Sequence, residues 1–556
     1  MKAVPGLTEV AILMNMFFNL DSAVRIISLT SAAAAISVGF TGCQTTPRCR
    51  PALPPPVVRP KAGPVIDVHS HMFNAHYVPV QQILEARGEL GETGIANPEF
   101  AWLVAKGINL WTGDSFRGRC IFSRTSDNRV PASARLALGA PQADYPKSVF
   151  TPRERSKLVE FLRVPGMRPS TTNNMFLEGI PSDGRMLMIA LERARFLAEE
   201  QPKPDEDFGA FVNTLTSAEL NIFEQAKREN EADGQEVGLF IQHMMDVENT
   251  YDGKAQITWK NQLSCYRQLD EASSGRVLHF VAFDPFSRKA ALDRVKRGTK
   301  EGAIGIKLYP PSGYRATSNA VPPEPKSGEA LRQQWKHRYS KLPGAALDAI
   351  LDQLFRYCTN LDIPLLAHCS PQGFEAGTNY GTNSDPVYWA MALARYPTLR
   401  ICFGHAGGED WWFPSTSFSN WAAYGSNVVE LCTTYSNAYC DTAFLDPILL
   451  PGGPNAFAAR LKSELDRTHD RPYKFSDKII YGSDWHMLTQ LKLRGQYLKC
   501  FKDAFRDPEL SKFEAQFFAG NAARFLKLSD VAQSKTLNEN QRSYLKALLG
   551  QIPIKN

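Results

Sequence analysis

The chain has 556 residues, of which 43% are hydrophobic and 22% are charged, and its formal net charge is +6. This length suffices for a large buried core and for more than one structural module. The small charge and the lack of a basic block with interleaved aromatic residues argue against nucleic acid as a partner. Because the composition is that of an ordinary globular protein, the function must be read from motifs.

The first 42 residues have the pattern of an export signal. Arg25 precedes an apolar run, 26–40, which is rich in Ala and Ser and is followed by small residues up to Gly42. A basic residue, a short apolar core and a small-residue cleavage site are typical of a secretory signal. The Gly-Cys step resembles a bacterial lipoprotein signal, which implies a lipid anchor on Cys43. The departure from that pattern is Phe40, where Leu is usual.

Two alternatives concern this N-terminal segment. A start at Met14 or Met16 would give the signal an ordinary length, and N-terminal sequencing of the exported protein would decide this. An uncleaved membrane anchor is the other alternative. Residues 43–63 are rich in proline and cannot form a packed element, so we expect an extended tether. Together these features predict an exported, periplasmic protein that is anchored to the membrane through Cys43.

A two-histidine motif follows the tether. Val65–His71 reads VIDVHSH, a short apolar strand that carries His69 and His71. Residues two apart on a strand point to the same face, so both imidazoles would project side by side with Asp67 one step behind. Two imidazoles on one rigid strand can chelate a metal ion. The alternative is two histidines in a loop without a metal, and this motif alone does not decide between them.

From residue 237 onward, short apolar runs alternate with helical patterns. Fully apolar strands separated by helices are typical of parallel strands buried on both faces. Eight of them predict a closed (β/α)8 TIM barrel; an open doubly wound sheet is the alternative, but no Gly-rich phosphate loop follows the first strand. The expected strands are Val65–His71, Val237–His243, Val277–Asp284, Ala303–Tyr309, Ile363–His368, Leu399–His405, Asn437–Thr442 and Lys478–Asp484.

A long stretch, 72–236, separates the first two expected strands. It contains helical patterns at 151–164 and 183–201. We expect a mainly helical insertion over one end of the barrel, which either shapes a substrate pocket or serves only as scaffold. The barrel domain would then span 64–530, and residues 531–556 would form a helical tail.

Polar side chains end the expected strands at one side of the barrel, where the active sites of such barrels are built. One histidine at a strand end is more often structural, but so many at the same end are hard to explain in that way. Buried polar groups need partners, and a divalent cation would satisfy them together. The residues concerned are His69, His71, His243, Lys307, His368, His405 and Asp484.

An ordered series of motifs resembles the amidohydrolase superfamily, and more closely its amidohydrolase-related branch, which contains the aminocarboxymuconate-semialdehyde decarboxylase type. Two departures are the insertion after His71 and His486, which stands where the family usually has proline. His486 either faces the site or lies in a surface loop. The motifs are VIDVHSH, GIKLYP at 305–310, PLLAHCS at 364–370, FGHAGG at 403–408, YGSDW at 481–485 and GNAARFLKL at 520–528.

The resemblance implies metal ligands and a catalytic base. His69, His71 and His368 would bind the metal. Asp484 would bind it too and would accept the proton of the attacking water. We expect one zinc-like ion rather than two, because members of this branch mostly hold one.

Three further residues have alternative roles, two of them under the same resemblance and His243 from its place at the end of a strand. In a one-metal site His405 would act on substrate or water, and in a two-metal site it would bind the second ion. A carboxylated Lys307 would bridge two ions, whereas an unmodified Lys307 would hold a substrate carboxylate or be structural. His243 would contact the substrate or only cap the barrel.

The implied reaction is hydrolysis of an amide, lactone or ester of a small organic substrate by metal-activated water. One alternative is a decarboxylase of the same branch, and another is a non-catalytic barrel lipoprotein. An exported location favours hydrolysis of scavenged substrates. The Trp411–Phe413 cluster either packs in the core or lines a pocket for an aromatic substrate. The chain has ten cysteines and no CxxC pair, so a cysteine zinc site is not expected, although export permits disulfides.

Overall fold

The computed structural model describes the barrel and parts of the insertion. The described residues are 64–89, 208–232, 234–340, 342–413 and 422–552, together with single residues between 101 and 112. Several expected segments lie outside them, namely the signal 1–42, the tether 43–63 with Cys43, and the helical patterns at 151–164 and 183–201.

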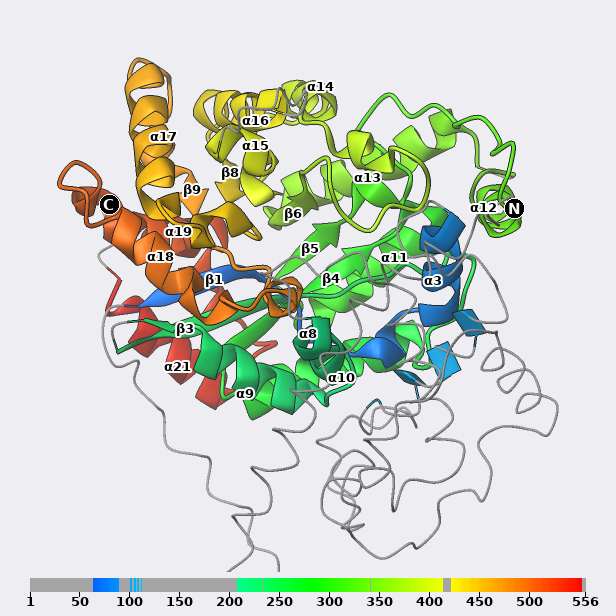
Figure 1. Cartoon of the computed structure of the whole chain (residues 1–556), viewed down its shortest axis with the longest axis horizontal. Helices are drawn as coiled ribbons and strands as arrows, with labels where there is room; N and C mark the ends of the chain where they lie inside the picture. The colour runs from blue at the N-terminus through cyan, green and yellow to red at the C-terminus, as the bar shows by residue number, and fades with distance from the viewer. Residues whose placement is uncertain are drawn as a thin grey trace, which may run out of the picture.

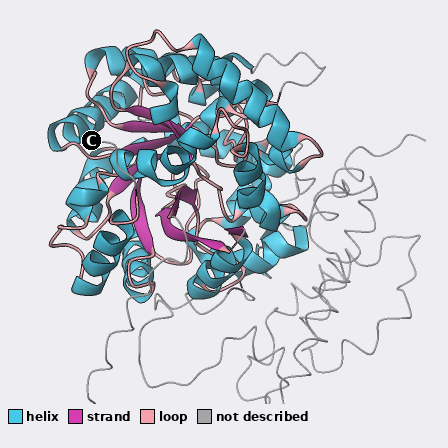
Figure 2. Ribbon diagram, turned by 90° about the vertical axis from the view of Figure 1, so that its left-hand side faces the viewer, coloured by secondary structure: helices cyan, strands magenta, loops and turns pink. Residues whose placement is uncertain are grey.

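Parallel strands form a barrel that is surrounded by helices (Figures 1 and 2). Each strand pairs in parallel with the next along the chain, as apolar strands linked by helices require. The predicted TIM barrel and the places of its strands are therefore confirmed. The strands are β1 (Val65–Ser70), β3 (Gln235–His243), β4 (Val277–Phe283), β5 (Gly305–Leu308), β6 (Leu365–His368), β7 (Ile401–Gly404), β8 (Ala438–Asp441) and β9 (Ile479–Ile480).

The barrel closes between β1 and the segment that follows β9. The Val68 amide donates to the Tyr481 carbonyl at 3.2 Å, and the Asp484 amide donates to the His69 carbonyl at 2.7 Å. These hydrogen bonds continue beyond the short strand β9. They place Asp484 directly beside the strand that carries the two histidines.

The helices around the barrel carry buried residues at helical spacing. In α13 (Gly344–Leu361), Leu347, Leu351 and Leu354 recur every three or four residues, and all three are buried. None of the described helices is long and apolar enough to cross a membrane. The other covering helices are α10 (Trp259–Ala272), α11 (Lys289–Lys300), α12 (Glu329–Tyr339), α14 (Val387–Arg395), α15 (Glu409–Trp412), α16 (Ala422–Thr434), α17 (Gly453–Arg467) and α18 (Tyr497–Ala504).

The described parts of the insertion are mainly helical. They comprise α3 (Val80–Glu89), α8 (Phe208–Leu215), α9 (Glu219–Glu229) and the short β2 (Glu231–Ala232), which pairs antiparallel with β3. α8 packs against the turn Met487–Gln490, which follows the last strand of the barrel. This part of the insertion therefore lies at the carboxyl ends of the strands, over the barrel mouth (Figure 1).

The opposite end of the barrel is closed by the C-terminal helices α19 (Asn521–Phe525), α20 (Leu528–Val531) and α21 (Glu539–Leu549). Phe525 packs on Phe280 and Tyr439 from the barrel interior. The Tyr544 hydroxyl donates to the Gly238 carbonyl at 2.5 Å. This end is apolar and filled, so the polar chemistry is confined to the other end.

Most cysteines in the described part of the chain are free thiols. Cys369, Cys402 and Cys440 are buried, as expected for thiols in apolar strands. Cys265 in α10 is disulfide-bonded, and every other described cysteine is free.

Candidate metal centre and catalytic site

Three of the predicted ligands come together at the carboxyl end of the barrel. His69 projects from β1, His71 follows that strand directly, and Asp484 follows β9; one ligand atom of each lies within 4.8 Å of the other two. The Nε2 atoms of His71 and His69 lie 3.3 and 3.9 Å from Asp484 Oδ1. All three residues are buried. Two imidazoles and a carboxylate at this spacing fit a divalent cation such as zinc.

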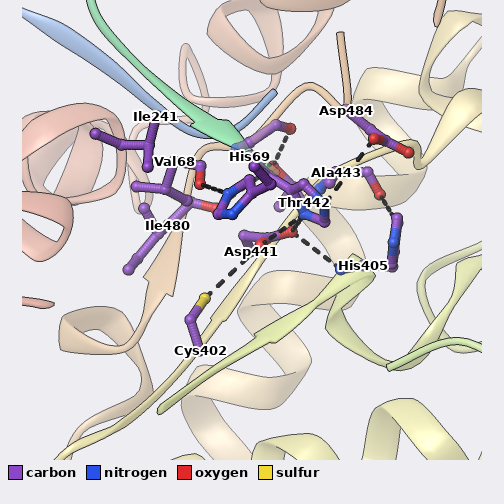
Figure 3. A network of polar contacts seen from close by, with 12 residues as sticks. Val68, His69, Ile241, Cys402, His405, Asp441, Thr442, Ala443, Ile480 and Asp484 are labelled. Carbon is purple, nitrogen blue, oxygen red and sulfur yellow. Dashed lines mark hydrogen bonds and ion pairs between the residues drawn. The ribbon is translucent and has the colours of Figure 1, made fainter. Parts of the chain in front are cut away.

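Asp441, at the end of β8, fixes the orientation of the His69 ring. Its Oδ2 lies 3.1 Å from His69 Nδ1, so Nε2 of His69 is the nitrogen that faces the centre. The backbone amide of His405 donates a hydrogen bond to Asp441 Oδ1 at 2.9 Å, and the Cys402 thiol lies 3.7 Å from Asp441 Oδ2 (Figure 3). Although burial raises the pKa of Asp441, the adjacent His69 holds it below its ordinary value. Carboxylates in this position set the tautomer and basicity of metal-binding histidines.

Sequence reasoning missed Asp441. The signal was present, because an acidic residue that ends a buried apolar strand is the same feature that marked Asp484. The predicted strand Asn437–Thr442 ended one residue after Asp441, so Asp441 was not recognised as the residue that ends the strand.

His71 and His243 are linked through the backbone. Nδ1 of His71 lies 3.0 Å from the His243 carbonyl, which leaves Nε2 of His71 for the centre. The His243 ring is 5.0 Å from the His69 ring, and its Nε2 is held 2.8 Å from the Val68 carbonyl. His243 is fully buried beside His69 and His71, and it is not among the described residues that line the cavity.

His368 and His405 form a second imidazole pair beside the first group. Their ring centroids are 4.5 Å apart, and the His405 ring is 4.9 Å from that of His69. Nδ1 of His405 lies 2.9 Å from the Ala443 carbonyl, so its Nε2 remains for the site. His368 is oriented differently, because its Nε2 lies 2.6 Å from the Gln372 carbonyl. Its role as a metal ligand stays a prediction, since it is outside the three-ligand group.

Lys307 lies at the middle of these groups. Its Nζ is 2.7 Å from His69 Nε2. Burial lowers the pKa of Lys307 to about 8. Burial also lowers the pKa of His405, to about 4, so that its imidazole is neutral at physiological pH. For Asp484, burial raises the pKa, but the nearby imidazoles of His71 and His69 hold it well below the ordinary range.

The backbone around the centre is strained and tightly packed. His405 and Asp484 have φ values of 66° and 55°, in the left-handed region that side chains other than glycine rarely adopt. Such strain is concentrated at functional sites. A Cβ atom at Gly404 would lie 3.0 Å from His69 Cε1, and one at Gly482 would lie 3.1 Å from His69 Cβ. Glycine at both positions lets the neighbouring backbone approach this ring.

A cavity of about 400 Å³ opens above the centre. Its floor is polar and contains most of the predicted residues, and its walls come from α3, α8 and the loops after the strands. The floor residues are His69, His71, Lys307, His368, His405 and Asp484. This is the ordinary form of a small-molecule site, a concave apolar pocket with a few convergent polar groups.

The structure also places the two features that the sequence left open. His486 is buried and lines the cavity, so it does not lie in a surface loop. Trp412 is fully buried and packs on Phe457 and Phe475 in the core. The Trp411–Phe413 cluster is absent from the described cavity lining and serves packing.

Comparison with known sequences identifies the family. A family model described as amidohydrolase matches residues 240–528, which is more than half of the chain. The chain belongs to the amidohydrolase family. The matched range begins within β3 and extends past β9, and it includes the predicted residues His368, His405 and Asp484 and the newly found Asp441. The amidohydrolase resemblance of the sequence is thus confirmed, while the closer branch stays a prediction.

Solved structures of other amidohydrolases show only distant likeness. One from Burkholderia multivorans, crystallised with bound zinc, is 12% identical with a TM-score of 0.36, over 57% of this chain and 92% of its own. A putative metal-dependent hydrolase from Lactobacillus casei is 13% identical with a TM-score of 0.33, over 84% and 96%. No curated protein matches this chain. The family assignment therefore rests on the sequence model.

Proposed function

We propose that this amidohydrolase-family protein is a hydrolase that uses one divalent ion, zinc, to cleave a C–N or C–O bond of a small organic substrate. The observation that carries the proposal is the buried group of His69, His71 and Asp484 on the floor of the cavity. Each histidine of that group has its Nδ1 occupied, so both Nε2 atoms converge on the carboxylate.

The donor set fits the proposed ion. His69, His71 and Asp484 would hold it, and His368 is a further candidate ligand. A bound divalent cation supplies Lewis acidity, which activates water near neutral pH and polarises a carbonyl. Two imidazole nitrogens and a carboxylate oxygen match the ligand set of catalytic zinc sites, which keep a position open.

The residues around the centre have separate tasks in this proposal. Asp484 is ionised at neutral pH because its pKa is held low, so its carboxylate accepts the proton of the attacking water. The neutral His405 donates from Nδ1 to the Ala443 carbonyl, so its Nε2 faces the cavity as a hydrogen-bond acceptor for water or for a donor group of the substrate. Lys307, beside His69, remains unmodified in a one-metal site and offers a hydrogen bond to the substrate.

The test uses the full chain loaded with zinc. We expect His69→Ala and Asp484→Asn to lower bound zinc from about one ion per chain to a small fraction, and to abolish hydrolysis of esters, lactones or amides. His337→Ala is the matched control, since this exposed histidine pairs with Asp252 at the surface. Elemental analysis, circular dichroism and a hydrolysis screen give the readouts. Unchanged turnover in both folded site variants would refute the assignment.

We also propose that the protein is exported to the periplasm and is anchored there through a lipid on Cys43. The signal and tether patterns support this location, and the disulfide at Cys265 suits an oxidising compartment. Expression with radiolabelled palmitate should label the full chain, and Cys43→Ser should abolish the label. A labelled Cys43→Ser chain, or an unlabelled full chain, would contradict the lipid anchor.

A further inference from the structure

The walls of the cavity above the metal centre are mainly apolar. Phe211 and Leu215, one helical turn apart on α8, face the cavity, and Ile83 and Leu84 of α3 line it from another side. Val247, in the loop after β3, adds to the same surface. A ligand gains binding free energy in proportion to the apolar area it removes from water. A small hydrophilic substrate would leave these walls in contact with water.

The walls contain few charged side chains that could pair with a charged substrate. Among the described lining residues, Lys307 is the one lysine or arginine, and it already lies beside His69 on the floor. Glu409 lines the cavity too, and its carboxylate accepts a hydrogen bond from Gln372 at 3.2 Å. A carboxylate on the body of a substrate would be desolvated here without a cation to pair with. The described walls therefore select for an uncharged body.

His486 is a buried polar residue in this mainly apolar wall. It is only 2% exposed and lines the cavity, and its Nε2 has no hydrogen-bond partner in the described part of the chain. Its ring lies between two phenylalanines, 5.0 Å from Phe73 and 5.1 Å from Phe211. Its φ of 93° is unusual for a side chain other than glycine. A buried polar atom without a partner is costly, and native proteins satisfy such atoms or use them.

Building on the proposed hydrolase function, we propose that the substrate is an uncharged ester, amide or lactone with an apolar body. The body fills the space between α3 and α8 while the scissile group lies over the polar floor. His486 binds a second polar group on that body, such as a ketone or hydroxyl, and so determines specificity.

The first experiment compares matched esters on the zinc-loaded full chain. The probes are 4-nitrophenyl acetate, 4-nitrophenyl hexanoate and the mono-4-nitrophenyl ester of adipic acid, whose acyl chain ends in a carboxylate. We expect kcat/KM for the hexanoate to exceed that for the acetate at least tenfold, and the adipate ester to fall below the hexanoate at least tenfold. Equal rates, or a preference for the carboxylated ester, would overturn the apolar assignment.

A binding measurement separates this inference from the proposed function. Acetophenone and hexanophenone are ketones that the enzyme cannot hydrolyse, and their binding is measured by calorimetry. We expect hexanophenone to bind at least tenfold more tightly. If no ester is cleaved and hexanophenone still binds more tightly, the hydrolase proposal fails and the apolar pocket stands. If both ketones bind equally or not at all, the pocket inference fails.

The role of His486 is tested with 4-nitrophenyl 4-oxohexanoate and 5-oxohexanoate. Each is compared with the plain hexanoate as a ratio of kcat/KM values. We expect His486→Leu to lower the ratio at least fivefold for one of the two ketones, and His486→Gln, whose amide reaches the same place, to keep it. His337→Leu is the control for the same substitution at an exposed site. Unchanged ratios for both ketones in a folded His486→Leu variant would overturn this role.

Discussion

At the scale of single residues, the hydrogen bond made by one ring nitrogen of each histidine determines which nitrogen remains for the metal centre. Asp441 holds Nδ1 of His69, and backbone carbonyls hold Nδ1 of His71 and of His405. His368 is held by Nε2 instead. The sequence predicted which residues end the strands, because that follows from apolar periodicity. It could not predict which ring nitrogen is engaged, because the acceptors for His69, His71 and His405 come from segments that are distant in the sequence.

The first residue-scale prediction concerns Asp441→Asn. The amide cannot act as a charged acceptor for His69 Nδ1, so the ring loses its fixed tautomer, and we expect zinc affinity to fall by about 10- to 100-fold. Competition with a chromogenic chelator measures it. Cys402→Ala, which removes the thiol on the other side of the same carboxylate, should change affinity less than threefold. Wild-type affinity in a folded Asp441→Asn variant would show that the contact has no such role.

The second residue-scale prediction is a dependence of stability on pH. Burial lowers the pKa of His486 from 6.5 to about 3. Between these values the unfolded chain binds a proton that the folded chain does not, so the contribution of this residue to stability is complete above pH 6.5 and falls as pH drops toward 3. Asp67 and Asp284, whose pKa burial raises to about 7, act in the opposite direction. The contribution of His486 to stability can therefore be measured only as a difference between wild type and a His486 variant.

We therefore expect metal-free His486→Gln to gain stability relative to metal-free wild type as the pH falls. The relative gain should be about 2 kcal/mol between pH 7.5 and pH 5. Urea unfolding at both pH values measures it. His337→Gln, at an exposed site, should show no such gain. If the difference in unfolding free energy between the variant and wild type does not change with pH, His486 is protonated equally well in the folded and the unfolded chain.

At the scale of elements, the barrel strands were predictable and the position of α8 was not. Short apolar runs and the spacing of Leu347, Leu351 and Leu354 in α13 are local signals, and the structure has these elements in place. α8 reaches the mouth by packing on the turn Met487–Gln490, a contact between segments far apart in the chain. No local pattern predicts such a contact, so the sequence left open whether the insertion shapes the pocket. The described part of the insertion does line it.

The element-scale prediction tests this role of α8. Phe211→Ala removes an aromatic wall of the cavity, so we expect the hexanoate-to-acetate ratio of kcat/KM to fall at least threefold. The matched control is Phe223→Ala on α9, whose buried ring packs on Phe240 rather than lining the cavity. Thermal unfolding of both variants accompanies the kinetics. If the ratio falls equally in both variants, the change reflects a general loss of packing, and α8 has no specific role in binding the substrate.

At the scale of the whole molecule, the centre joins the beginning of the barrel to its end. His69 lies on the first strand, His71 follows it directly, and Asp484 follows the last strand. The sequence predicted this meeting, since the carboxyl ends of parallel barrel strands gather at one mouth. The sequence did not predict how strongly the first and last strands are held together there. In the structure β9 pairs over only Ile479–Ile480, and the joint relies on hydrogen bonds beyond that strand.

Removal of the metal should therefore weaken this joint in particular. An ion that binds only the folded state stabilises it by about 4 kcal/mol when its concentration is 1,000 times its Kd, so chelation should lower Tm by several degrees. Because the ligands lie on both sides of the joint, hydrogen exchange should quicken on chelation at 65–71 and 481–485. It should change little at Glu539–Leu549, at the far end of the barrel. Asp484→Asn should show neither response to zinc, and a uniform change across the wild-type barrel would mean that the ion does not act through the joint.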